Sequence, residues 1–134
     1  MRCGLLHYLS TIIDETLGGI VMLEQFFLQL STEPESISFE QSIQLIDSLY
    51  EFTPTSFING DLQNAAGENN GSCKILAFAA LHQLSEPQTL QLFGDYYRVE
   101  VMPDLKGTNH QNIRNFMRTG WDGVSFAGQA LHGK

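Results

Sequence analysis

The feature that most constrains this chain is a stretch rich in glycine and asparagine that leads directly into its most apolar segment. The stretch Asn59–Lys74 opens on the turn dipeptide Asn59-Gly60 and consists largely of small and amide residues. Ile75–Leu81 then follows, apolar on every side. A helix that is apolar all round is normally buried. The rest of the chain must therefore fold around this helix, with the loop at its start.

Hydrophobic periodicity and cap signals predict the other elements. Three pairs of cap residues, Ser38 with Gln41, Ser85 with Gln88 and Thr108 with Gln111, predict capping boxes, and Ser72 is the expected cap of the apolar helix. The expected helices span residues 23–30, 39–50, 75–84, 85–93 and 108–119, with short strands at 55–58 and 124–126. Residues 95–102 fit either a helix or a strand, and the tail after residue 128 is predicted to be loose. The sequence thus predicts an α+β fold, a helix-rich single domain with a small β-sheet.

The first 21 residues differ from the remainder. The pair Gly18-Gly19 separates them from Met22, which can itself serve as a translation start. We interpret residues 1–21 as an N-terminal extension or a false start, and residues 22–134 as the domain. If the extension is present, its apolar residues predict a short amphipathic helix.

Charge and cysteine content exclude several classes of protein. The net charge is −8, with −9 on residues 1–73 and +1 on residues 74–134. A chain this acidic is a poor partner for nucleic acid or an anionic membrane surface, so neither is predicted. Two cysteines make no disulfide framework, which fits a reducing compartment.

The loop and the cations that follow it predict a site for an anion. Free N–H groups at a helix start can hold a carboxylate or phosphate, and Lys74 follows the loop directly. The spacing from Gly67 to Gly71 does not fit a nucleotide-binding P-loop. The candidate ligand-binding residues are Asn64, Asn69, Ser72, Lys74, Arg98 and Arg114, and the alternative is a capped turn that only starts a buried helix.

Cys73 suggests a second kind of chemistry. A helix N-terminus and the neighbouring Lys74 would lower the pKa of its thiol, and His110 or His82 could act as the base of a cysteine hydrolase or transferase. The alternative is a buried packing residue. The four histidines have no ligand-like spacing, so no metal and no cofactor are predicted.

Several blocks of the sequence, in order, resemble the HopJ type III effector family. They are FTPTSFING (52–60), NAAGEN (64–69) with GSCK (71–74), FGDYYR (93–98), and HQNIRNFM (110–117) with GW (120–121). The resemblance runs from about Met22 to near the C-terminus. It implies a compact α+β domain and a location in the bacterial cytoplasm, or in a host cell if a type III system is present. It implies no catalytic residues.

Three functions remain open at this point. The first is a small soluble protein that binds an anionic small molecule or peptide at the loop. The second is a cysteine-dependent enzyme that uses Cys73 and His110. The third is an effector-type module that binds a protein partner through its acidic helical face.

Overall fold

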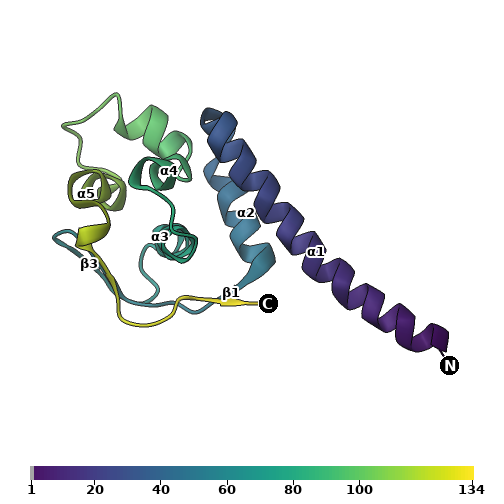
Figure 1. Cartoon of the computed structure of the whole chain (residues 1–134). Coiled ribbons are helices and arrows are strands. Elements are labelled where there is room, and N and C mark those ends of the chain that lie inside the picture. Colours follow the sequence, from purple (N-terminus) through teal and green to yellow (C-terminus); the bar gives the residue numbers. More distant parts are fainter. Residues whose placement is uncertain (1) are drawn as a thin grey trace.

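The computed structural model describes the backbone of residues 2–134 and the side chains of residues 17–134. Five α-helices, two short 3₁₀ turns, one π-helical turn and five short strands follow one another along the chain (Figure 1). The elements are α1 (Arg2–Thr32), η1 (Pro34–Ser36), α2 (Phe39–Leu49), β1 (Tyr50–Phe52), β2 (Phe57–Asn59), β3 (Leu62–Asn64), α3 (Asn70–Leu81), α4 (Glu86–Gln91), η2 (Tyr96–Val101), α5 (Gln111–Thr119), η3 (Gly120–Gly123), β4 (Val124–Phe126) and β5 (Leu131–Gly133). The prediction of a helix-rich α+β domain with few strands is confirmed.

Helix α3 lies at the centre of the domain, as its sequence predicts. Figure 1 shows it between α2 and α5, with α4 above it. Its residues Ile75, Leu76, Phe78 and Ala79 are fully buried. Aromatic rings pack round it, and Phe78 contacts Phe26 at 6.2 Å between ring centroids. The buried helix therefore joins the N-terminal helices to the C-terminal half.

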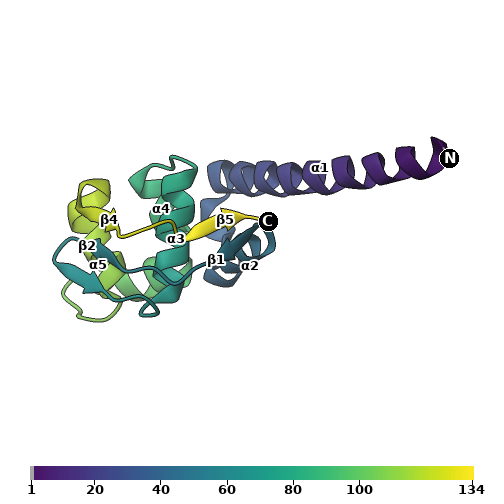
Figure 2. The same ribbon diagram turned by 90° about the horizontal axis from the view of Figure 1, so that it is seen from below.

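Two small antiparallel sheets connect distant parts of the chain. In the first, β1 pairs with β5 so that Glu51 lies opposite His132. In the second, β2 is the central strand between β3 and β4, with Ile58 opposite both Gln63 and Ser125. The expectation of a loose tail after residue 128 is wrong, because β5 is paired along its whole length. Figure 2 shows β5 lying beside β1 near the C-terminus.

Of the four predicted helix caps, those at Ser38 and Ser85 are present and those at Ser72 and Thr108 are not. The Ser85 hydroxyl accepts a hydrogen bond from Gln88 N, and Gln88 completes the capping box by accepting from Ser85 N. Ser38 caps α2 in the same way, although the side chain of Gln41 bonds to Gln29 instead of returning to the cap.

The caps predicted at Ser72 and Thr108 are wrong. Helix α3 begins after Asn69 and α5 begins after His110, and both of these residues adopt left-handed backbone conformations with φ near 50°. Neither side chain caps its helix. The first N–H groups of both helices are therefore left without a side-chain partner.

Two further expectations change. Helix α1 runs through Gly18-Gly19 without interruption, so the glycine pair does not end a helix. Residues 96–101 form a π-helical turn rather than an α-helix or a strand. Such turns are rare and frequently lie at functional sites.

Among the described residues, no helix has the length and apolar character needed to cross a membrane.

A half-buried histidine at the end of α3 predicts a loss of stability in acid. His82 lies against the rings of Phe27 and Phe78, its Nε2 is 2.6 Å from the Tyr50 hydroxyl, and burial lowers its pKa below 6.5. The unfolded chain therefore takes up this proton first, and stability is lost as the pH falls below about 6.5 towards the folded-state pKa.

The measurement is urea unfolding at about pH 7.5 and about pH 5.5, on either side of the unfolded pKa. We expect His82→Gln to lose less stability over this interval than the wild type. His132→Gln, at an exposed histidine, should lose as much as the wild type. Equal losses in all three proteins would contradict the assignment.

Candidate binding cleft

The first turns of α3 and α5 meet at a cleft of about 420 Å³. The turn η2 and the start of α2 complete its wall. The lining residues are Phe39, Leu62, Asn69, Gly71, Ser72, Phe93, Tyr96, His110, Gln111, Asn112 and Ile113. None of them is an aspartate, a glutamate, a lysine or an arginine. In a protein with a net charge of −8, this cleft is therefore lined without carboxylates.

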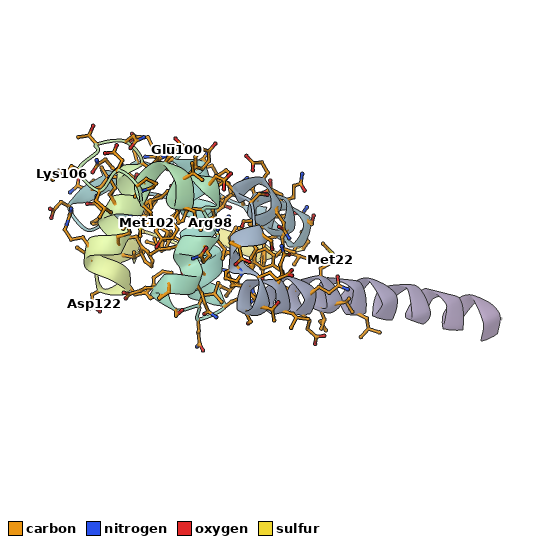
Figure 3. All side chains as sticks on the ribbon, turned by 90° about the horizontal axis from the view of Figure 1, so that it is seen from above. Met22, Arg98, Glu100, Met102, Lys106 and Asp122 are labelled. Carbon is orange, nitrogen blue, oxygen red and sulfur yellow. The ribbon has the colours of Figure 1, made fainter. Side chains whose placement is uncertain are left out.

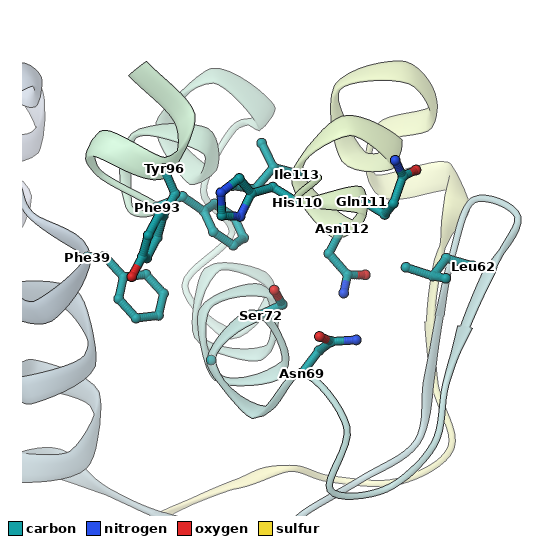
Figure 4. Close-up of a pocket in the computed structure, with 11 residues that line it drawn as sticks. Phe39, Leu62, Asn69, Ser72, Phe93, Tyr96, His110, Gln111, Asn112 and Ile113 are labelled. Carbon is teal, nitrogen blue, oxygen red and sulfur yellow. The ribbon is translucent and has the colours of Figure 1, made fainter. Parts of the chain in front are cut away.

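Polar groups of the two helices face the same space. Figure 4 shows the side chains of Asn69 and Asn112 pointing toward one another, with the Ser72 hydroxyl beside them. Among the described residues, no hydrogen bond is formed by the backbone N–H groups of Gly71, Ser72, Gln111 and Asn112 or by the Ser72 hydroxyl. Free N–H groups at a helix start, together with the helix dipole, favour a negative or strongly polar group.

Aromatic rings form the opposite side of the cleft. The Tyr96 ring lies 5.1 Å from Phe39 and 5.0 Å from His110, between centroids. His110 Nε2 is 3.0 Å from Glu100 Oε1 on the same π-helical turn that carries Tyr96. The turn thus positions both an aromatic wall and the partner of His110.

A network of buried amides lies beneath the cleft. Asn59, Asn64 and Asn112 are each at most 5% exposed. Asn59 Nδ2 donates to the backbone O and side-chain Oδ1 of Asn112 at 2.8 and 3.0 Å. Asn64 Oδ1 accepts from Asn69 Nδ2 at 2.7 Å and from Asn112 Nδ2 at 3.0 Å. The network thereby fixes the start of α3 to the start of α5.

The structure places the predicted ligand-binding residues in different surroundings. Asn69 and Ser72 line the cleft and Asn64 lies directly beneath it. Lys74 instead pairs with Asp47 at 2.8 Å. Arg98 donates to the backbone oxygens of Pro34, Ile37 and Gln91, and Arg114 to those of Asp104 and Asn109.

The expected convergence of these three cations on the loop is therefore not found. The sequence also gave no sign that Asn59 and Asn112 share a buried network, or that Phe39 lines the cleft. The paired helix starts show only once α3 and α5 are packed together.

Cys73 is a packing residue in this structure. It is 1% exposed, it is absent from the cleft lining, and its thiol donates to the Thr55 carbonyl at 3.6 Å. Burial raises the pKa of the thiol, which is the opposite of the lowering expected from the helix dipole and Lys74. No described contact between Cys73 and His110 supports a nucleophile and base. The buried position of Cys73 therefore does not support its use as a nucleophile.

The fold and the site together define the protein as an α+β domain with a cleft between the starts of two helices. Residues 23–131 match the family described as HopJ type III effector protein, and the chain belongs to that family. A solved structure, titled as the crystal structure of the unknown function protein VPA0580, is 49% identical. The match covers 84% of this chain and 93% of that one, with a TM-score of 0.82. None of the curated proteins matches the chain.

Proposed function

We propose that this HopJ-family protein binds a small anionic or strongly polar molecule in the cleft between α3 and α5. The observation that carries the proposal is the meeting of two uncapped helix starts in one cleft that has no carboxylate in its lining. The N–H groups of the two first turns would hold the anionic group. Phe39 and Tyr96 would contact a flat or apolar part of the same ligand.

The size of the cleft supports a small ligand. A volume of about 420 Å³ lies within the range of small-molecule sites. The rings supply apolar area, while the amides and Ser72 supply a few fixed polar groups. This combination matches the usual composition of such sites.

The family name supports a setting for this activity as well. We propose that the protein acts in the bacterial cytoplasm, or in a host cell when a type III system delivers it. The same ligand site would operate in either place, because it depends on no group outside the domain.

The test is a titration of ¹⁵N-labelled protein with benzoate, inorganic phosphate and the neutral analogue benzamide, followed by amide chemical shifts. We expect benzoate to shift the N–H signals of Gly71, Ser72, Gln111 and Asn112 most. Benzamide should act several-fold more weakly, because it lacks the charge that the helix starts favour. Shifts with phosphate alone would show that the anion is held without the aromatic contact.

Gly71→Ala provides the matched variant. A Cβ at this position would lie 2.7 Å from Phe39 Cζ, so this ring of the cleft wall must move. Benzoate binding should weaken about tenfold, or by about 1.4 kcal/mol. Gly18→Ala, where an added Cβ meets nothing within 4 Å, should bind as the wild type does. Shifts centred outside the cleft, or unchanged binding by Gly71→Ala, would overturn the proposal.

A further inference from the structure

A second depression lies on the other side of α5, between that helix and the segment that follows η2. Its volume is about 330 Å³. Val101, Leu105 and Gly107 form one side, and α5 forms the other. We call it the basic groove, and its lining residues are Val101, Leu105, Gly107, Gln111, Arg114, Met117 and Arg118. Gln111 and Arg118 are seven residues apart, so the α5 side is about 10 Å long.

The charge of this groove is opposite to that of the protein. Arg114 is held by the Asp104 backbone oxygen at 2.6 Å and by the backbone and side-chain oxygens of Asn109 at 2.5 and 2.7 Å. All three acceptors are neutral, and no described carboxylate forms an ion pair with Arg114 or with the exposed Lys106 beside the groove. These contacts fix the guanidinium in position. The Asp104 carboxylate lies beside it without pairing, since a Cβ added at Gly107 would lie 2.4 Å from Asp104 Oδ2 and 2.6 Å from Arg114 Nη2.

Arg118 adds a second guanidinium at the end of the groove. Its side chain is 57% exposed and lies 3.8 Å from Asp61, whose own carboxylate is almost fully in water. An exposed pair of this kind contributes little and is readily exchanged for another carboxylate. Three of the seven lysines and arginines of the chain thus lie in or beside one groove.

Several apolar side chains at and near the rim of the basic groove are exposed to solvent. Leu105 is 66% exposed at the rim, and Met102 and Val99 on the preceding turn are 43% and 60% exposed. Figure 3 shows Met102 and Lys106 at the end of the molecule that lies away from the free end of α1. Apolar surface bordered by polar groups is typical of protein interaction sites.

We propose that the basic groove binds a short acidic peptide segment of another protein, with carboxylates on Arg114 and Arg118 and an apolar side chain against Leu105 and Met117. Three or four extended residues span about 10 Å and match the α5 side of the groove. The net charge of −8 opposes a long polyanion such as nucleic acid, whose binding depends on many phosphate contacts. Two arginines beside apolar side chains instead fit a peptide that carries both carboxylates and a leucine-like residue.

The experiment is selection of a phage library of random peptides, about twelve residues long, against the immobilised full chain. We expect the enriched peptides to combine Asp or Glu with a large aliphatic residue. Labelled copies should bind in fluorescence anisotropy, with an affinity that falls as salt is raised. Their affinity should fall at least threefold in Arg118→Gln and in Leu105→Ser, and stay within twofold of the wild type in Arg118→Lys, which keeps the charge.

Lys134→Gln is the control for a general change in charge, because Lys134 lies outside the groove and donates to the Asp47 backbone. It should leave the affinity unchanged. The proposal is overturned if no peptide is enriched, if the enriched peptides are basic or uncharged, or if Arg118→Gln binds as well as the wild type. It is also overturned if the chain instead forms a dimer that Arg118→Gln dissolves, because the occupant is then a second copy.

Discussion

Gly94→Ala is expected to destabilise the protein by about 3–4 kcal/mol, since it combines a strained backbone with a collision against another backbone segment. Gly94 joins α4 to η2 with φ at +61°, a conformation that residues with a Cβ rarely adopt. A Cβ there would lie 2.5 Å from Phe39 N and 3.0 Å from Ser38 C. Backbone atoms at the start of α2 cannot rotate away as a side chain can, so the two segments must separate.

The measurement is the free energy of unfolding from urea titration. Gly67→Ala separates the two contributions, because Gly67 also has a positive φ, +91°, but an added Cβ would meet nothing within 4 Å. It should cost only the strain, about 1–2 kcal/mol. If Gly94→Ala costs no more than Gly67→Ala, the close approach of Gly94 to α2 does not exist in solution.

Asn112→Ala should be the second most damaging change, with a loss of about 2–4 kcal/mol. The Asn112 side chain is 5% exposed, accepts from Asn59 and Asn64, and donates to Asn64. Its removal leaves buried amide groups without partners, and each unsatisfied group costs more than the lost hydrogen bond itself gains. The same loss would free the start of α5 from the start of α3.

Gln111→Ala is the matched control for this variant. Gln111 is the neighbouring residue on α5 and is exposed, so its replacement should change stability by at most about 0.5 kcal/mol. Urea unfolding measures both variants. A cost below about 1 kcal/mol for Asn112→Ala would mean that water replaces the network without loss, and the amides would not position the cleft.

Much of the fold follows from local sequence signals. The apolar run after Ser72 predicts the buried helix, and Ser38 and Ser85 mark the starts of α2 and α4. The starts of α3 and α5 are missed because Asn69 and His110 use a left-handed conformation in place of a side-chain cap. Asparagine tolerates that conformation better than most residues. An asparagine in the sequence therefore allows a left-handed helix start but does not predict one.

Sequence patterns fail most often where the residues that contact one another lie far apart in the chain. Strand β5 is stable only against β1, which lies about 80 residues earlier, so no local pattern marks it. The charge of Arg98 makes it a candidate ligand contact in the sequence. In the folded chain Arg98 binds oxygens of Pro34 and Ile37, more than 60 residues away. The sequence does point to one wall of the cleft, because Asn69 and Ser72 of the glycine- and asparagine-rich loop line it. The other wall comes from η2 and α5, and its position depends on how these elements pack against α3.

Both sheets have a consequence for how the protein is made. Strands β4 and β5, within residues 124–133, pair with β2 and β1, which lie within residues 50–59. A ribosome must therefore translate the 64 residues between Asn59 and Val124 before the central strand β2 can gain its second neighbour. Pairing over so long a loop is slow compared with the formation of local helices. Until it occurs, the newly made chain holds its helices beside an open strand edge, which is the stage at which chaperones or premature association compete with folding.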